Sequence, residues 1–203
     1  MSPLNVVVLA ADTSLVKAPS ISYAALAPIL IVLGAACLGI VVEAVAPRER
    51  RFSLQIGLTL LALLAALIDV ITLRGRSTLT AAGALSIDGV TLFLQGSILV
   101  LGALSVLIMA ERAVEPGGAI VASAAVVVGS PADRRLASSE RVQTEIFPLT
   151  LFAIGGMLIF PAANNLLLMF VALEVLSLPL YLIAGLSRRR RLLSQEAAIK
   201  YFL

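Results

Sequence analysis

Glu174 lies deeper in an apolar segment than the other acidic residues of the sequence. Its segment runs from Asn165 to Leu186, and Glu174 stands nine positions from one end and twelve from the other. Along a helix these separations are roughly 13 Å and 18 Å, so the carboxyl group cannot reach water at either end. Because a carboxylate is costly in hydrocarbon, Glu174 must be protonated, paired or next to a hydrated cavity. A carboxyl group in that position can hold and release a proton.

Two residues just after Glu174 add polar groups to the same region. Ser177, about one turn further along, contributes a hydroxyl on roughly the same helix face. Pro179 has no N–H, so the carbonyl of Val175 loses its helical partner. The carboxyl, the hydroxyl and the freed carbonyl together predict a polar spot that can hold water. The alternative is a purely structural carboxylic acid whose hydrogen bonds come from a neighbouring helix.

Lys200 is the second candidate for proton chemistry. With Ser194 as the N-cap, Lys200 lies roughly 9 Å into a helix, with apolar and aromatic residues on both sides. If this helix packs against the one that carries Glu174, the two residues differ by roughly 9 Å in depth, which two extended side chains or one water can bridge. The competing interpretation is a lysine whose long side chain snorkels to the membrane surface.

The composition predicts that these segments lie in a membrane. Of the 203 residues, 60% are hydrophobic and 13% are charged, and the mean hydropathy is +1.07. Soluble domains are closer to half apolar and a quarter charged, whereas a membrane-spanning helix needs about 20 mostly apolar residues. We therefore expect an all-α, polytopic membrane helix bundle with five complete transmembrane helices. The five segments are Ser22–Ala46, Phe52–Leu73, the stretch that starts after Asp88-Gly89 and runs to Ala110, Thr144–Phe160 and Asn165–Leu186.

The start of a sixth helix follows these five segments. It opens at Ser194 and stops at Leu203 after roughly 15 Å, which cannot cross a membrane, so we expect the chain to be part of a longer protein. The apolar run Ala119–Val128 is about half as long as a span, and we interpret it as part of a loop insertion. The expected organisation is a tail at 1–21, three spans in 22–110, the loop at 111–143, and the remaining helices in 144–203.

The basic residues are sorted by loop. The connections after the first, third and fifth spans hold eleven arginines, including the consecutive Arg188–Arg191, whereas the opposite side holds Lys17, Arg74 and Arg76. The positive-inside rule therefore predicts an N-terminus outside and arginine-rich loops in the cytoplasm. A topology signal explains the four-arginine run better than a nucleic-acid surface does, so no nucleic-acid partner is expected.

Several further residues have structural interpretations. Glu43 and Asp69 lie near the ends of their spans, where we expect solvated helix ends rather than pathway residues. Asp88 is expected to cap the third span, and Asn164-Asn165 to end one helix and cap the next. The glycines expected to permit close helix packing are Gly34, Gly39, Gly155 and Gly156.

Redox chemistry and metal binding are not expected in this chain. The sequence has no His and a single Cys, Cys37. It therefore lacks a ligand set for zinc, haem or an iron–sulfur cluster, and it has no disulfide framework.

The region that holds Glu174 and Lys200 resembles subunit N of bacterial respiratory complex I, the proton-pumping NADH:quinone oxidoreductase. The resemblance is carried by LEVLSLPLYLIAG at Leu173–Gly185, an arginine-rich turn, and SQEAAIKYFL from Ser194. Weaker similarity extends upstream through IFPLTLFAIGGMLI at 146–159 to Asp88-Gly89.

The resemblance implies that Glu174 and Lys200 correspond to the family's fifth-helix glutamate and sixth-helix lysine, which are implicated in proton translocation. It implies a fold of about fourteen helices with two inverted five-helix repeats. Because this chain stops before the family's seventh-helix lysine and broken helices, we do not expect it to conduct protons alone. The resemblance also implies a bacterial inner membrane location and a hetero-oligomer with antiporter-like and small membrane subunits. Flavin, iron–sulfur clusters and quinone would then belong to other subunits.

Two alternatives remain open at this point. A sister subunit, L or M, or a multisubunit cation/proton antiporter shares the intramembrane Glu and Lys but is less similar to the SLPLY and EAAIKYF segments. A non-catalytic assembly subunit, in which Glu174 only ties helices together, belongs to a different functional class.

Overall fold

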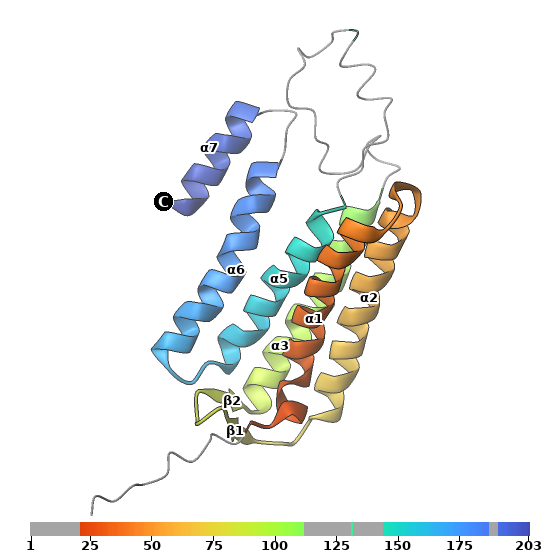
Figure 1. Cartoon of the computed structure of the whole chain (residues 1–203). Coiled ribbons are helices and arrows are strands. Elements are labelled where there is room, and N and C mark those ends of the chain that lie inside the picture. The colour runs from red at the N-terminus through yellow and green to blue at the C-terminus, as the bar shows by residue number, and fades with distance from the viewer. Residues whose placement is uncertain (1–20, 112–130, 132–143, 187–190) are drawn as a thin grey trace, which may run out of the picture.

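The computed structural model describes residues 21–111, 131, 144–186 and 191–203. Nearly all of the expected tail at 1–21 and of the expected loop at 111–143, including Ala119–Val128, lies outside the described residues. The described part is a bundle of helices with one short hairpin, so the expected all-α membrane helix class is confirmed (Figure 1).

The first two helices form an antiparallel pair. Helix α1 spans Tyr23–Val45 and helix α2 spans Arg48–Thr72. Ala46 and Pro47 between them have extended backbones, with ψ of 141° at both. Proline disfavours a helical conformation in the residue before it and is well suited to the start of a new helix, so this dipeptide ends α1 and begins α2.

A small hairpin connects α2 to α3, and the sequence analysis did not predict it. Strands β1 (Thr78–Thr80) and β2 (Leu85–Ile87) are antiparallel, with Thr78 opposite Ile87 and Thr80 opposite Leu85. The turn between them includes Gly83, whose φ of 81° lies in the left-handed region that glycine adopts without steric cost.

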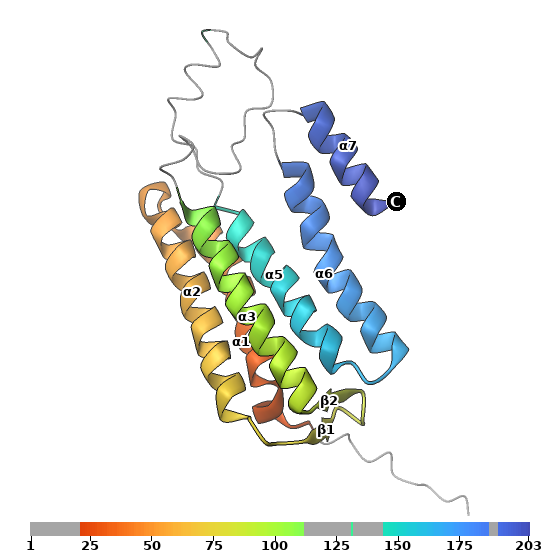
Figure 2. The ribbon, with the colours of Figure 1, turned by 180° about the vertical axis from the view of Figure 1, so that it is seen from behind.

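Helix α3 spans Gly89–Ala110, beside α2 and α5 (Figure 2). The expected cap is confirmed, because the Thr91 backbone N–H donates to the Asp88 carboxylate at 2.8 Å. This backbone hydrogen bond, assisted by the Thr91 side chain, holds the pKa of Asp88 below its ordinary value.

Replacing this cap is expected to weaken the start of α3. Asp88→Ala should lower the free energy of unfolding by about 1 kcal/mol at neutral pH. Because the pKa of Asp88 is depressed in the folded state, this stabilisation is present above the unfolded-state pKa and is lost as pH falls through the folded-state value. Thermal unfolding of the purified protein in detergent at pH 7 and in acid measures the effect. Asp88→Asn is the control, since an amide oxygen caps at every pH, and equal stability of Asp88→Ala and the unaltered protein at pH 7 would contradict the prediction.

The next helix, α5 (Ile146–Ile159), continues into a short 3-10 helix, η1 (Phe160–Ala162). Together they cover 17 residues, so the described residues contain four helices long and apolar enough to cross a membrane, plus this shorter one. Four of the five expected spans thus have spanning length, and the segment predicted at Thr144–Phe160 is the shorter helix. The run ends early because Pro161 falls in the 3-10 turn and Ala163 forms a β-bridge with Leu85 of the hairpin.

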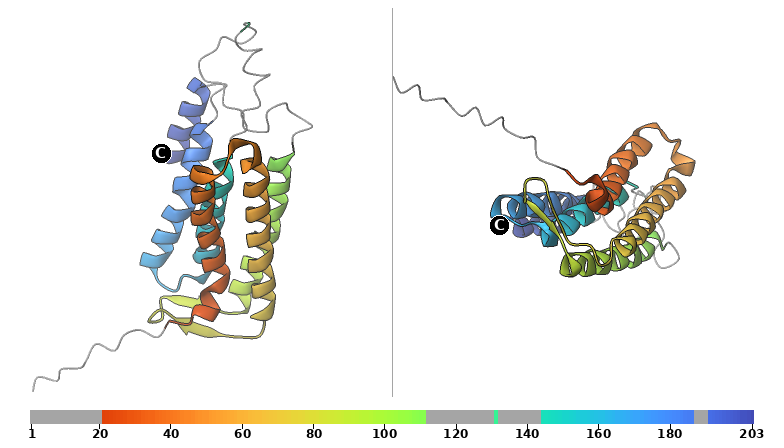
Figure 3. Two further views of the ribbon diagram at one scale, coloured as in Figure 1. Left: turned by 45° about the vertical axis from the view of Figure 1, so that its right-hand side comes forward. Right: turned by 90° about the horizontal axis from the view of Figure 1, so that it is seen from below.

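Protein surrounds α5 on most sides. It packs against α1, α3 and α6, and its side chains include the fully buried Phe147, Leu151 and Leu158. Seen from below, α6 and α7 lie on one side of the bundle and α2 on the other (Figure 3). The helix that falls short of spanning length is therefore the one at the centre.

Helices α6 (Leu166–Leu186) and α7 (Arg191–Phe202) complete the bundle. The expected role of the two asparagines is confirmed. The backbone N–H of Leu168 donates to Asn165 Oδ1 at 2.7 Å, and Asn164 donates to the carbonyls of Ala84 and Gly83 in the hairpin turn.

The helix ends next to the arginine-rich connections all lie at one end of the helix bundle. The C-terminal ends of α1, α3 and α6 and the N-terminal ends of α2, α5 and α7 lie at one end of the bundle, and the hairpin lies at the other (Figure 1). The connections that hold most of the arginines therefore leave from a common end, as the loop count requires.

Candidate functional site

Glu174 lies near the middle of α6 and is partly buried. Helix α6 packs against α5 on one side and contacts α7 on another. Close approach to α5 occurs at Gly156, where an added Cβ would lie 2.4 Å from the backbone nitrogen of Leu176. Because Leu176 is two residues from Glu174, this contact sets the position of the carboxyl-bearing turn against the centre of the bundle.

The glycine expectations are largely confirmed. At Gly155 an added Cβ would meet the Leu33 side chain of α1 at 2.4 Å, and at Gly39 it would meet the Pro148 side chain of α5 at 3.0 Å. Gly34 differs, since nothing lies within 4 Å of its Cβ position. The prediction of close packing at Gly34 was therefore wrong for the described part of the chain.

Ser177 and Pro179 are both buried on α6, which continues through the proline without a break. The hydroxyl of Ser177 donates to the carbonyl of Leu173 in its own helix. Back-bonding of this kind is common for serine inside a helix. In this structure the Ser177 hydroxyl therefore points to the backbone of its own helix, one turn earlier.

Lys200 lies on α7 and is exposed. Its Nζ is 2.6 Å from Oε1 of Glu196, one turn earlier, and the two side chains are 73% and 55% exposed. An exposed pair at this spacing contributes little to stability. In this structure Lys200 therefore pairs with Glu196 and not with Glu174.

The helices that carry the two candidates are neighbours, as the predicted pairing requires. The ring of Tyr181 on α6 meets the rings of Tyr201 and Phe202 on α7, with centroids 5.0 Å and 5.6 Å apart. Glu174 lies seven residues before Tyr181, roughly 10 Å along the helix axis. Lys200 is next to Tyr201, so the two candidates occupy adjacent helices at different levels.

A model of the family described as "NADH:quinone oxidoreductase/Mrp antiporter, TM" matches residues 163–203, the stretch that contains both candidates. The chain is 58% identical over 187 residues to NADH-quinone oxidoreductase subunit N of Salinispora arenicola, covering 92% of this chain and 36% of that protein. It is 52% identical over 204 residues to the subunit N of Parafrankia sp., covering 100% of this chain and 39% of that protein. The chain belongs to the subunit N family.

A chain of a solved respiratory complex I structure has a similar fold. The chain superposes on a chain of the structure titled "Respiratory complex I from Thermus thermophilus with bound Aureothin" with a TM-score of 0.60 and 27% identity. The match covers 86% of this chain and 32% of that one. This chain thus spans less than two fifths of the length of the subunit N relatives given above. The relatives favour subunit N over the sister-subunit and cation/proton antiporter alternatives.

Sequence reasoning missed a polar cluster that joins three helices of this subunit N chain. Glu43 of α1 accepts from Arg51 at 2.8 Å and from Gln55 at 3.2 Å, both on α2, and from Thr144 just before α5 at 2.7 Å. The same Gln55 amide donates to the Gly39 carbonyl at 2.7 Å. The expected solvated end at Glu43 is corrected, because its side chain is only 18% exposed and protein groups surround it.

Part of this cluster could have been read from the sequence. Arg51 and Gln55 are four residues apart, so they share one face of α2. The part played by Thr144 could not be predicted from the sequence, since Thr144 lies 101 residues from Glu43. The cluster fixes α1, α2 and the start of α5 to one another at the end where the arginine-rich connections leave.

No metal site is apparent in the described ranges. Among those residues, no group of three or more His, Cys, Asp or Glu side chains is placed to hold a metal ion.

Proposed function

We propose that this chain serves in the antiporter-like, proton-translocating membrane subunit of a respiratory NADH:quinone oxidoreductase in the bacterial plasma membrane. The proposal rests mainly on one observation: a carboxyl group in the middle of an apolar helix stands beside a second helix that carries a lysine. The family match over 163–203 supports it, because it covers both helices.

In this proposal Glu174 and Lys200 act as a proton-handling pair. Glu174 holds a proton, or as a carboxylate sets the charge of its partner, because an unpaired charge at mid-bilayer is unfavourable. Lys200 relays the proton from the neighbouring helix. Pro179 supports the site by leaving the Val175 carbonyl without its helical partner, within about one turn of the carboxyl group. The Ser177 hydroxyl donates to the Leu173 carbonyl, and its oxygen supports the site as an acceptor. Energy would come from redox chemistry in other subunits, which hold the flavin, the iron–sulfur clusters and the quinone.

The proposed orientation follows from the basic residues. The end of the bundle where α1 ends and α2 begins faces the cytoplasm, and the hairpin faces outside. The connection at 111–143 is then cytoplasmic. The partners are the other antiporter-like and small membrane subunits of the complex.

Substitutions of Lys200 test its proposed role as the proton relay on α7. Lys200→Ala in the assembled complex, with the full-length subunit, should remove more than half of the proton pumping, whereas Lys200→Arg should restore most of it because a cation remains. Pumping is measured as NADH-driven acidification of inverted membrane vesicles, per amount of assembled complex. Glu196→Gln is the matched control, since it removes the partner that Lys200 has in this structure. If Lys200→Ala pumped normally, or if Glu196→Gln lost as much, the relay role would be rejected.

A further inference from the structure

An open groove runs along the outside of the bundle between α2 and α3. Its volume is about 830 Å³, and most of its lining is apolar. Leu67 and Ile71 of α2 form one wall, and Phe93 and Leu101 of α3 form part of the other. Ile71, Phe93 and Leu101 are all more than half exposed. In a membrane, this groove would face lipid.

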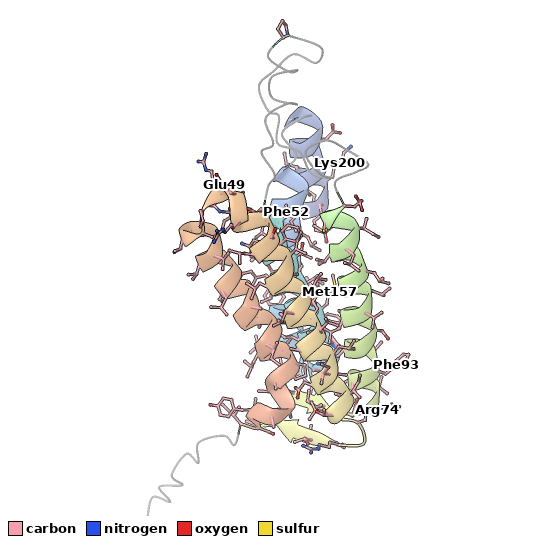
Figure 4. The ribbon with its side chains drawn as sticks, turned by 90° about the vertical axis from the view of Figure 1, so that its right-hand side faces the viewer. Glu49, Phe52, Arg74, Phe93, Met157 and Lys200 are labelled. Carbon is pink, nitrogen blue, oxygen red and sulfur yellow. The ribbon has the colours of Figure 1, made fainter. Side chains whose placement is uncertain are left out.

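One end of the groove is cationic. Arg74, on the turn that follows α2, lines the groove at the hairpin end of the bundle, close to Phe93 (Figure 4). The Arg74 side chain is exposed. The ion pairs among the described residues, Arg51–Glu43 and Lys200–Glu196, do not include it. Arg76, two residues further on, is also exposed. No acidic side chain is found in the described lining, and the nearby Asp88 carboxylate is held by the cap of α3.

The length of the groove matches one leaflet of a bilayer. Its lining on α3 runs from Gly89 to Leu101, which is roughly 18 Å along the helix. The hydrocarbon core of a bilayer is about 30 Å thick, so one leaflet contributes about half of that. The arginine thus lies at the level expected for headgroups, and the apolar walls extend over the depth of one set of acyl chains.

The floor of the groove is open because Gly96 has no side chain. A Cβ at Gly96 would lie 3.7 Å from Cγ1 of Val70, which is ordinary contact, so a methyl group fits there. A larger side chain at this position would extend into the groove. The space between the two helices therefore depends on this glycine.

We infer that the groove binds an anionic phospholipid, with an acyl chain between α2 and α3 and the phosphate at Arg74. Guanidinium groups bind phosphate oxygens in a bidentate geometry. A zwitterionic headgroup carries the same phosphate but also its own cation, so the two exposed arginines, Arg74 and Arg76, favour a headgroup with a net negative charge. The inference requires only that α2 and α3 span the membrane. It is independent of proton translocation.

The test uses the purified complex with the full-length subunit, stripped of lipid in detergent. It is then supplied with phosphatidylglycerol that carries a photoactivatable diazirine on one acyl chain, or with phosphatidylcholine that carries the same chain. Adducts are located by proteolysis and mass spectrometry. We expect phosphatidylglycerol to label the α3 segment at 92–101, and Arg74→Gln to reduce that labelling about fivefold, the effect of one basic residue near an anionic lipid surface.

Two glycine variants distinguish lipid bound in the groove from lipid bound elsewhere on the surface of the bundle. Gly96→Leu should abolish labelling by both lipids, because leucine fills the floor. Gly57→Leu is the matched control, since Gly57 is exposed on α2 with nothing within 4 Å of its Cβ position, and its labelling should not change.

Three results would overturn the inference. Equal labelling by both lipids, unaffected by Arg74→Gln, would show a groove without headgroup recognition. Absence of any adduct on α3 would show that a neighbouring protein segment covers the groove. Loss of labelling in Gly57→Leu as large as in Gly96→Leu would show a general structural effect.

Discussion

Glu174→Gln is expected to lower proton pumping by the assembled complex far more than it lowers the amount of complex. Glutamine has nearly the same shape and still forms hydrogen bonds, but its amide does not ionise near neutral pH, so it cannot take up and release the translocated proton. We expect pumping to fall by more than half, with complex abundance close to normal. NADH-driven acidification of inverted vesicles measures pumping, and native gel electrophoresis of the same membranes measures abundance.

Glu49→Gln is the control for this experiment. Glu49 is an exposed carboxylate in the first turn of α2, so the same chemical change there should affect neither quantity (Figure 4). If Glu174→Gln reduced pumping and abundance equally, Glu174 would only tie helices together. The non-catalytic assembly interpretation would then replace the proton-handling proposal.

Gly156→Ala, which adds a single methyl group at the centre of the bundle, is expected to destabilise the protein strongly. The added Cβ would lie 2.4 Å from the Leu176 nitrogen and 2.8 Å from its Cα, so the backbone of α6 must move away from α5. Overpacking of this kind costs about 1–3 kcal/mol, and occasionally more. The melting temperature of the purified complex and the fraction of assembled complex in membranes should both fall.

Gly34→Ala is the matched control on α1. Nothing lies within 4 Å of its Cβ position, and alanine favours a helix over glycine, so its stability should be unchanged or slightly higher. If Gly156→Ala behaved in the same way, α6 would not be pressed against α5 as the structure shows. A displaced α6 should also carry Glu174 with it, so pumping per assembled complex should fall in Gly156→Ala as well.

The effect of Glu174→Gln on pumping and the effect of Gly156→Ala on stability both depend on how α6 is held at the centre of the bundle. The Glu43 cluster holds α1, α2 and the start of α5 together at one end, and Gly155 and Gly39 bring α1 against α5. Gly156 then seats α6 on the same helix. The position of the helix that carries Glu174 therefore follows from a close backbone contact at Gly156 and from the packing of α1 against α5, not from lipid packing alone.

The sequence by itself determined the membrane class, most helix bounds and the caps. These features are local: apolar length predicts a span, and Asp88 and Asn165 cap the residues that follow them. The sequence also located Glu174 and Lys200, because a charge in an apolar segment is conspicuous without any knowledge of its neighbours.

Only the tertiary structure decided which groups meet. Glu43 meets Thr144 across 101 residues, the hairpin pairs with Ala163 after α5, and Lys200 contacts Glu196. Hydropathy records how much apolar surface a helix has but not which neighbour covers it. Contacts between distant segments depend on how helices pack. A glycine is needed only where another segment lies against its missing Cβ, as at Gly156 and not at Gly34.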